Sequence, residues 1–144
     1  MVNPNNFIRF LIWTDGRIGA ETAKKPIKDV ETFEFTFSNG VEEWYAYDME
    51  GWRRALMTAK ACNLTISAKR NNGDTGSDYL AGLFMANGED ANTGIDVIFP
   101  DGSIFEIPVV ANVTNIGGGA STDVAGLEAE LVSDGKPTYT PGEG

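Results

Sequence analysis

The 144-residue sequence predicts a mainly β fold, a β-sandwich or partly closed barrel with one short α-helix packed against it. Apolar and polar residues alternate in several short runs, which is the period-two pattern of strands with one buried face. Turn-forming residues such as Pro100-Asp101-Gly102 separate these runs. One stretch, beginning at Ser77 or Asp78, has the spacing of an amphipathic helix. We therefore expect six or more strands and one helix.

The stretch of residues 94–119 is the centre of this prediction. Residues 95–99 alternate as a strand does, a turn follows at 100–102, and residues 104–114 alternate again. Pro108 lies inside the second run. Because proline has no amide proton for a strand ladder, we place it at a sheet edge or at a bend between two sheets. The second face of this strand mixes apolar and polar residues, which favours a subunit that becomes partly covered on assembly.

The remaining elements follow in chain order, and none of them marks a boundary between domains. Residues 30–37 form a clear strand because three phenylalanines alternate with other side chains, and Ser38-Asn39-Gly40 predicts a turn after it. Asn87-Gly88 predicts the end of the helix. The other expected elements are an N-terminal arm (about 1–6), a strand (7–13), a loop (17–29), two strands (64–69 and 124–132) and an extended C-terminal arm (about 133–144). We expect residues 1–144 to form one domain.

An aromatic segment, residues 41–60, follows neither a helical nor a strand period. Trp44, Tyr45, Tyr47 and Trp52 lie in it among charged residues. Three interpretations remain open for such a segment: a ligand-binding loop, a contact surface for another protein, or a loop folded over its own core.

The residue content disfavours catalysis. The chain has no histidine, which excludes Ser-His-Asp triads and the usual histidine-containing zinc sites. Cys62 is the single cysteine, so no intrachain disulfide is possible and a buried structural thiol is expected. The Gly117-Gly118-Gly119 run lacks the context of a phosphate-binding loop, and residues 74–78 lack the ligand spacing of a calcium loop. We therefore expect no enzyme activity, no metal site and no cofactor.

The distribution of charge is more informative than the net charge of −10. Ten of the eleven basic residues lie at or before Arg70, whereas twelve of the 21 acidic residues follow it. An acidic surface disfavours nucleic-acid binding, because phosphates are neutralised by lysine and arginine. A basic half and an acidic half suit head-to-tail packing of identical subunits. Ordinary solvated surface charge explains the same pattern without any partner.

The sequence also bears on location. No segment has the length and apolar content of a membrane-spanning helix. The N-terminal residues lack the basic and apolar regions of a secretory signal. We therefore expect a cytosolic protein or a component of an assembled particle.

Five segments stand in a fixed order along the chain. They are EWYAYDMEGWRRALMTAK (43–60), LTISAKRNNGDTGSDYLAGL (64–83), the turn PDGS (100–103), IPVVANVTNIGGG (107–119) and LEAELVSDGKPTYTP (127–141). Together they resemble the major tail tube protein of long-tailed bacteriophages, especially those that infect Gram-positive hosts. The resemblance covers about residues 30–141 and is less clear in the first thirty residues.

This resemblance implies a structural virion protein whose fold is shared with contractile-tail tubes and type VI secretion tubes. Such proteins form hexameric rings that stack into a tube, with one sheet of each subunit joining a continuous β-barrel around a lumen and the helix packed outside. Loops and terminal arms bridge the rings. The implied partners are other copies of the chain, a tape-measure protein in the lumen, and tail terminator and distal tail proteins at the ends. DNA passes through without specific binding, and the implied location is the phage tail, after assembly in the bacterial host cytoplasm.

Two sets of residues are predicted to serve such an assembly. Carboxylates that alternate with apolar residues would face the lumen, where negative charge prevents retention of DNA. Aromatic and basic residues would contact other subunits or the next ring. The lumen candidates are Glu34, Asp96, Glu106, Glu128 and Glu130. The contact candidates are Trp44, Tyr45, Tyr47, Trp52, Arg53, Arg54, Lys69, Arg70, Lys136 and Tyr139.

Two alternative functions remain compatible with the sequence. A carbohydrate-binding β-sandwich would use the aromatic segment to stack on sugars, although the missing signal peptide and the charge split disfavour it. A tail component that does not stack, such as a terminator or a decoration domain, would form rings without forming tubes.

Overall fold

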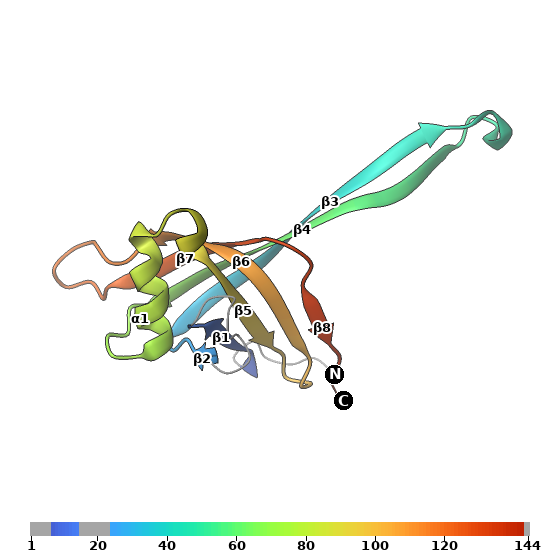
Figure 1. Ribbon diagram of the computed structural model, residues 1–144. Helices are drawn as coiled ribbons and strands as arrows, with labels where there is room; N and C mark the ends of the chain where they lie inside the picture. Colours follow the sequence, from blue (N-terminus) through green and yellow to red (C-terminus); the bar gives the residue numbers. More distant parts are fainter. Residues whose placement is uncertain (1–6, 15–23, 143–144) are drawn as a thin grey trace.

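The described part of the chain, residues 7–14 and 24–142 of this computed structural model, contains one antiparallel sheet of eight strands with helix α1 packed against it (Figure 1). Neighbouring strands follow the order β2-β1-β5-β6-β7-β4-β3, and β8 pairs with β6. The strands are β1 (Arg9–Trp13), β2 (Lys24–Pro26), β3 (Val30–Tyr45), β4 (Arg53–Lys69), β5 (Asn92–Ile98), β6 (Ile104–Asn115), β7 (Gly126–Ser133) and β8 (Thr138–Thr140). The helical segments are α1 (Thr75–Gly82) and the short 3-10 turns η2 (Tyr47–Met49), η3 (Leu83–Met85) and η4 (Gly88–Ala91).

The predicted fold class is confirmed: the described residues are mainly β, with one short α-helix. The sheet is not closed into a barrel, because β2 and β3 remain as its two edges. Helix α1 lies on the core side of the sheet, where Leu80 and Ala81 are buried. No helix of the described residues covers the opposite face of the sheet (Figure 1).

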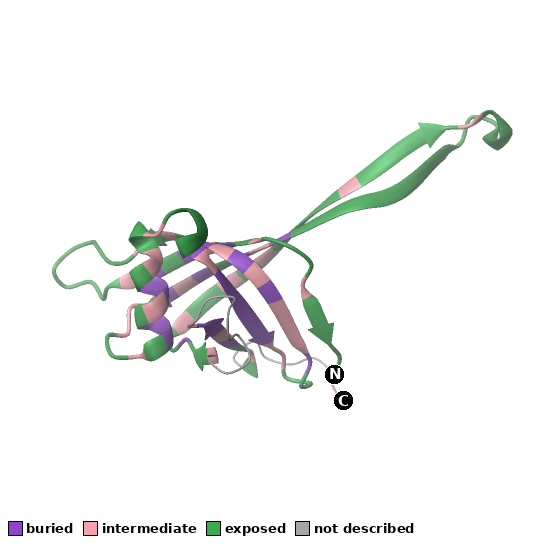
Figure 2. Ribbon diagram, viewed as in Figure 1, coloured by how far each residue is buried: buried purple, intermediate pink, exposed green. Residues whose placement is uncertain are grey.

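The core consists of the apolar residues that alternate along the strands. Ile95 and Val97 of β5 lie opposite Ile107 and Phe105 of β6, so their side chains share one face of the sheet. Buried residues concentrate where the sheet meets the helix, and the outer part of β3 and β4 is exposed (Figure 2). The large apolar side chains that are fully buried are Ile12, Leu64, Ile66, Leu80, Ile95, Val97, Ile107, Val109, Leu127 and Leu131.

The β5–β6 hairpin predicted around residues 100–102 is present, and Pro108 has a clear place in it. Residues 104–106 of β6 pair with β8, whereas the pairing of β6 with β7 begins at Val109. Pro108 lies between these two paired regions of β6, and its carbonyl accepts a hydrogen bond from the Asp134 N–H at 2.9 Å. The proline nitrogen points to the same side, so the missing N–H removes no bond to β5.

Two expectations for residues 38–60 are wrong. Residues 38–40 do not form a turn and residues 41–60 are not a loop, because β3 continues to Tyr45 and β4 returns from Arg53. The register shifts between Gly40 and Val41, which leaves Thr58 as an extra residue on β4. This bulge interrupts the alternation, and exposure of both faces removes the apolar pattern that a buried strand would show.

The helix begins earlier than the sequence pattern indicates. Its N-cap is Asp74, whose carboxylate accepts the Ser77 N–H at 3.1 Å. The α-helical part ends at Gly82 and continues only as the 3-10 turn η3, so Asn87-Gly88 does not terminate it.

Two smaller elements also differ from expectation. Lys24–Pro26 forms β2 inside the expected loop of residues 17–29, and Thr138–Thr140 forms β8 inside the expected C-terminal arm. This part of the arm is therefore paired to the sheet of its own chain. The N-terminal arm, residues 1–6, lies outside the described residues.

Candidate functional site

The outer halves of β3 and β4 leave the sheet as a two-stranded projection (Figure 1). The two strands pair continuously out to Tyr45 and Arg53, whereas β7 pairs with β4 only from Asn63 onward. We call residues 37–61 the projecting hairpin. The eight residue-to-residue steps from Phe37 to Tyr45 extend it by roughly 26 Å beyond the core.

The projecting hairpin carries large apolar side chains that no other part of the described chain buries. Tyr47 is fully exposed at 107%, and Trp52 and Tyr45 are exposed at 75% and 70%. Isolated two-stranded hairpins are marginally stable in water, and contiguous exposed apolar surface usually marks an interaction site. The exposed large apolar residues of the hairpin are Phe37, Val41, Trp44, Tyr45, Tyr47, Met49, Trp52, Leu56 and Met57.

Local contacts shape the hairpin without burying it. Arg53 forms an ion pair with Glu43 at 3.5 Å, and the Arg54 guanidinium lies 5.8 Å from the ring centre of Trp44. At the turn Glu50 has a left-handed backbone conformation, with φ at 54°. The structure therefore brings together six of the predicted contact residues, Trp44, Tyr45, Tyr47, Trp52, Arg53 and Arg54, on one projection.

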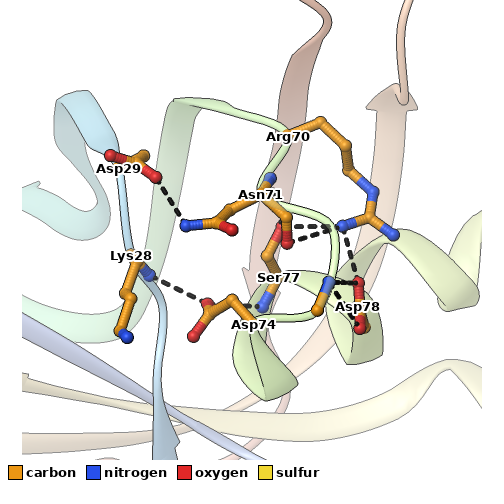
Figure 3. Close-up of polar contacts among 8 residues, drawn as sticks. Lys28, Asp29, Arg70, Asn71, Asp74, Ser77 and Asp78 are labelled. Carbon is orange, nitrogen blue, oxygen red and sulfur yellow. Dashed lines mark hydrogen bonds and ion pairs between the residues drawn. The ribbon is translucent and has the colours of Figure 1, made fainter.

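Arg70, by contrast, is used inside the chain (Figure 3). Its guanidinium forms an ion pair with Asp78 at 2.8 Å and donates hydrogen bonds to the Ser77 hydroxyl at 3.0 Å and the Asn71 carbonyl at 3.1 Å. The Asn71 amide in turn donates to the Asp29 carboxylate at 2.7 Å. These contacts hold the start of α1 against the segment that leads into β3, which is a structural role.

The other three contact candidates lie apart from the hairpin tip. Lys69 forms an ion pair with Glu31 at 3.1 Å. Tyr139 lies on β8 with its ring edge toward Phe105, at a centroid distance of 6.5 Å. Lys136 is exposed in the segment between β7 and β8, near the base of the projecting hairpin.

At that base lies an apolar groove of about 600 Å³. Cys62 is one of its lining residues, and burial raises the pKa of its thiol. The Ser133 hydroxyl accepts the Cys62 N–H at 3.0 Å, which ties the C-terminal segment to β4. The groove, which we call the base groove, is lined by Phe37, Lys60, Ala61, Cys62, Phe105, Ser133, Gly135, Lys136 and Pro137. Sequence reasoning missed it because its lining comes from four separate parts of the chain.

The five predicted lumen carboxylates share the face of the sheet opposite the core. Glu34 lies opposite Thr65, which lies opposite Glu130, and Asp96 lies opposite Glu106. Each of these acidic residues sits between two core-facing neighbours of its strand, so its side chain points to the other face. Glu34 and Glu128 are exposed and Glu130 is half-buried.

Asp96 is different because its carboxylate is enclosed by the chain itself, at 3% exposure. It accepts a hydrogen bond from Trp13 Nε1 at 2.8 Å and forms an ion pair with Lys24 Nζ at 2.8 Å. Lys24 also lies 3.6 Å from Glu106. Burial lowers the pKa of Lys24, but the hydrogen bond and charge of Asp96, together with Glu106, outweigh burial and raise it. One lysine thus offsets the charge of two of the five candidates.

No group of three acidic or cysteine side chains suited to a metal ion occurs within the described ranges. Within the same residues, no helix has the length and apolar character needed to cross a membrane. No buried side-chain nitrogen or oxygen in this part of the chain lacks a hydrogen-bond partner.

No protein-family model matches the sequence, and no curated protein matches it. Solved structures do match. A chain from the tail of an empty gene transfer agent (GTA) particle, determined by helical refinement with C6 symmetry, is 16% identical with a TM-score of 0.74, over 97% of this chain and 100% of that one. A chain from the native GTA virion is 15% identical with a TM-score of 0.72, over the same shares of the two chains.

A third match is a chain from the cap that terminates the tube of the anti-feeding prophage. It is 14% identical with a TM-score of 0.56, over 97% of this chain and 91% of that chain. At these identities the likeness establishes a common fold. Because it spans nearly the whole chain, the matched region includes the projecting hairpin as well as the sheet.

Proposed function

We propose that this chain is the structural subunit of a phage-like tail tube, and that six copies form a ring and rings stack into a conduit for DNA. The observation that carries the proposal is the projecting hairpin, where the aromatic side chains of Tyr45, Tyr47 and Trp52 are each at least 70% exposed. The likeness to a chain from a C6-symmetric tail supports the same conclusion. A subunit that needs neighbours to cover its apolar surface is an assembly component.

The two edges of the open sheet support self-assembly. The outer edges of β2 and β3 have no neighbouring strand in the described residues. Such edges present backbone N–H and C=O groups that readily pair with another chain. In the proposed ring, copies of the subunit complete one another's sheets, which removes these edges.

The face opposite the core would line the lumen, with Glu34, Glu128 and Glu130 as its exposed or half-exposed carboxylates. Carboxylates there would prevent passing DNA from adhering, because DNA affinity comes from basic contacts to phosphate. Glu106 is half-buried and contributes less, since it shares Lys24 with Asp96. Asp96 is enclosed, so we leave it out of the proposed lining.

The remaining parts of the proposal follow from the tube model. A tape-measure protein would occupy the lumen before DNA passes, and terminator and distal tail proteins would bind the two ends. The projecting hairpin and the terminal segments, with Lys136 and Tyr139, would contact neighbouring copies. The chain would be assembled in the host cytoplasm and reside in the virion tail.

A concentration series of the purified protein tests the assembly directly. Light scattering coupled to size exclusion should show a hexamer or larger species, and negative-stain microscopy should show six-fold rings and tubes. A chain that remains a single copy at every concentration would contradict the proposal. A carbohydrate-binding module would behave in that way and would bind a glycan array, and rings that never stack would indicate a terminator or decoration protein.

Cysteine labelling tests the position of the acidic face. In a Cys62→Ser background, Glu130→Cys in assembled tubes should react with a small maleimide but not with a bulky polyethylene-glycol maleimide, because the lumen restricts access. Glu89→Cys, on the exposed turn η4, is the matched control and should react with both. Equal reaction of the two positions with the bulky reagent would place this face outside the tube.

A further inference from the structure

We propose that the base groove receives the hairpin tip of a second copy of this chain, with tip carboxylates facing groove lysines. This inference rests on the proposed function, since it takes another copy as the partner. It goes further by naming both halves of the contact.

The base groove has an apolar floor and a basic rim. Phe37, Phe105 and Pro137 contribute apolar walls, and Lys60 and Lys136 are exposed at the sides. None of the lining residues is acidic, and neither lysine forms an ion pair within the described residues. A space of about 600 Å³ is large enough to hold an aromatic side chain and its neighbours. The groove therefore suits an aromatic segment with negative charge beside it.

The hairpin tip has that composition. Residues 41–52 contain four carboxylates and no lysine or arginine. Glu43 is paired with Arg53, whereas Asp48 and Glu50, which lie in the turn between β3 and β4, have no ion pair among the described residues. Tyr47 and Trp52 stand beside them, and both are exposed. Aromatic anchors with complementary charge at their edge are the usual composition of a protein interface.

The occupant must come from another molecule. The tip points away from the body of its own chain, so it cannot fold back into the groove at its own base (Figure 1). Tip and groove are different surfaces of one chain, so the contact is head-to-tail and repeats from copy to copy. Such a contact closes into a ring or continues as a filament, and neighbouring copies would be offset by about the length of the hairpin, roughly 26 Å.

Charge reversal tests both halves of the contact. Lys60→Glu with Lys136→Glu, and separately Asp48→Lys with Glu50→Lys, should each raise the protein concentration needed for assembly by roughly tenfold or more, because like charges then meet. The variant carrying all four substitutions should assemble near the wild-type concentration. The matched control combines Asp48→Lys and Glu50→Lys with Arg9→Glu and Lys28→Glu, which restores the net charge without altering the groove or the β2 edge. This control should still need a higher protein concentration for assembly than the wild type, because the groove lysines would still face lysines at the tip.

A crosslink provides an independent measurement. In a Cys62→Ser background, Glu50→Cys with Lys136→Cys should form intermolecular disulfides under mild oxidation, visible as a ladder on non-reducing gels. Glu50→Cys with Lys25→Cys should not form this ladder. Circular dichroism of each variant should match the wild type, which shows that assembly and not folding has changed.

The outcomes separate the two proposals. If the wild-type chain never assembles, both the proposed function and this contact fail. If the wild type assembles but the groove and tip reversals assemble at unchanged concentration, or the control is rescued as well as the fourfold variant, only the docking contact is overturned.

Discussion

The two halves of β4 make the same ladder with β3, yet they meet opposite environments. From Cys62 to Ala68 every second residue is buried, whereas Arg53 to Ala61 are exposed throughout. Both halves are rich in apolar residues: Leu64 is fully buried and Leu56 is 59% exposed. Strand pairing is therefore continuous across a boundary at which the core ends. The comparison teaches that strand pairing alone does not bury apolar residues, because burial also needs the core and β7 beside β4. The exposed outer half is the part that we propose to contact other copies.

The body and the projecting hairpin are also stabilised differently. In the body, β4 has β3 and β7 as neighbours and an apolar core beneath it. The hairpin is held by its one ladder and by a few local side-chain contacts on exposed residues. Its order depends on being a continuation of two strands that the body holds in register. Folding energy therefore resides mainly in the body. We propose that the hairpin contributes mainly to assembly, and the following variants test this separation.

Removal of the outer hairpin should have the largest effect. Replacing residues 41–57 with a short Asn-Gly turn between Gly40 and Thr58 should abolish rings and tubes, since the exposed aromatic residues are lost. The thermal unfolding midpoint should change by only a few degrees, because few core contacts involve this segment. A full-length variant with Trp44, Tyr45, Tyr47 and Trp52 replaced by threonine is the matched control for length and should also fail to assemble. Tubes formed by the truncated chain would contradict the proposal that assembly depends on the hairpin.

The same substitution at two leucines of β4 compares the buried half of the strand with its exposed half. Leu64→Ala should lower the free energy of unfolding by about 3 kcal/mol, because it leaves a cavity in a packed core. Leu56→Ala should change it by no more than about 0.5 kcal/mol, since the side chain is exposed. Chemical denaturation of the unassembled protein measures both. Conversely, Leu56→Ala should raise the concentration needed for assembly, and similar destabilisation by both variants would show that the hairpin is part of the folding unit.

This comparison explains which features could be predicted from sequence. Alternation at Phe33 and Phe35, and again at Ile95 and Val97, predicted the core strands because these apolar side chains all point to the core face of the sheet. The same rule placed Glu34 and Glu130 on the opposite face. It failed in residues 41–60 because both faces are exposed and the extra Thr58 shifts the period.

Contacts between distant parts of the chain could not be predicted from local patterns. The base groove joins Cys62 of β4 to Lys136 of the C-terminal segment, and no local pattern relates them. The burial of Asp96 depends on Trp13, 83 residues away in sequence, and on Lys24. The alternation of β5 indicates only that Asp96 faces away from the core, which is also true of an exposed carboxylate.

Substitutions at two carboxylates on the same face of the sheet should differ less in their effect on the free energy of unfolding. Asp96→Asn should lower the free energy of unfolding by about 2 kcal/mol, because it leaves Lys24 with one more distant partner and weakens a buried network. Glu130→Gln should leave it nearly unchanged, because no ion pair of the described residues involves this side chain. Denaturation of both variants at neutral pH measures the difference. Equal stability of the two would show that the enclosed network contributes little.

The smallest expected effect is a difference in pH dependence between the Lys24–Asp96 ion pair of the body and the Arg53–Glu43 ion pair of the hairpin. Lys24 has a raised pKa in the folded chain, so folding favours its protonated form. Its contribution to stability is complete below its ordinary pKa of 10.5 and is lost as pH rises through the higher folded-state value. Unfolding followed from pH 8 to 12 should therefore show an alkaline loss that Lys24→Met lacks. Arg53→Met should retain it, because the Arg53–Glu43 pair is exposed and arginine stays protonated throughout this range. If both variants kept the wild-type pH dependence, the alkaline loss would have to come from groups outside the Lys24 network.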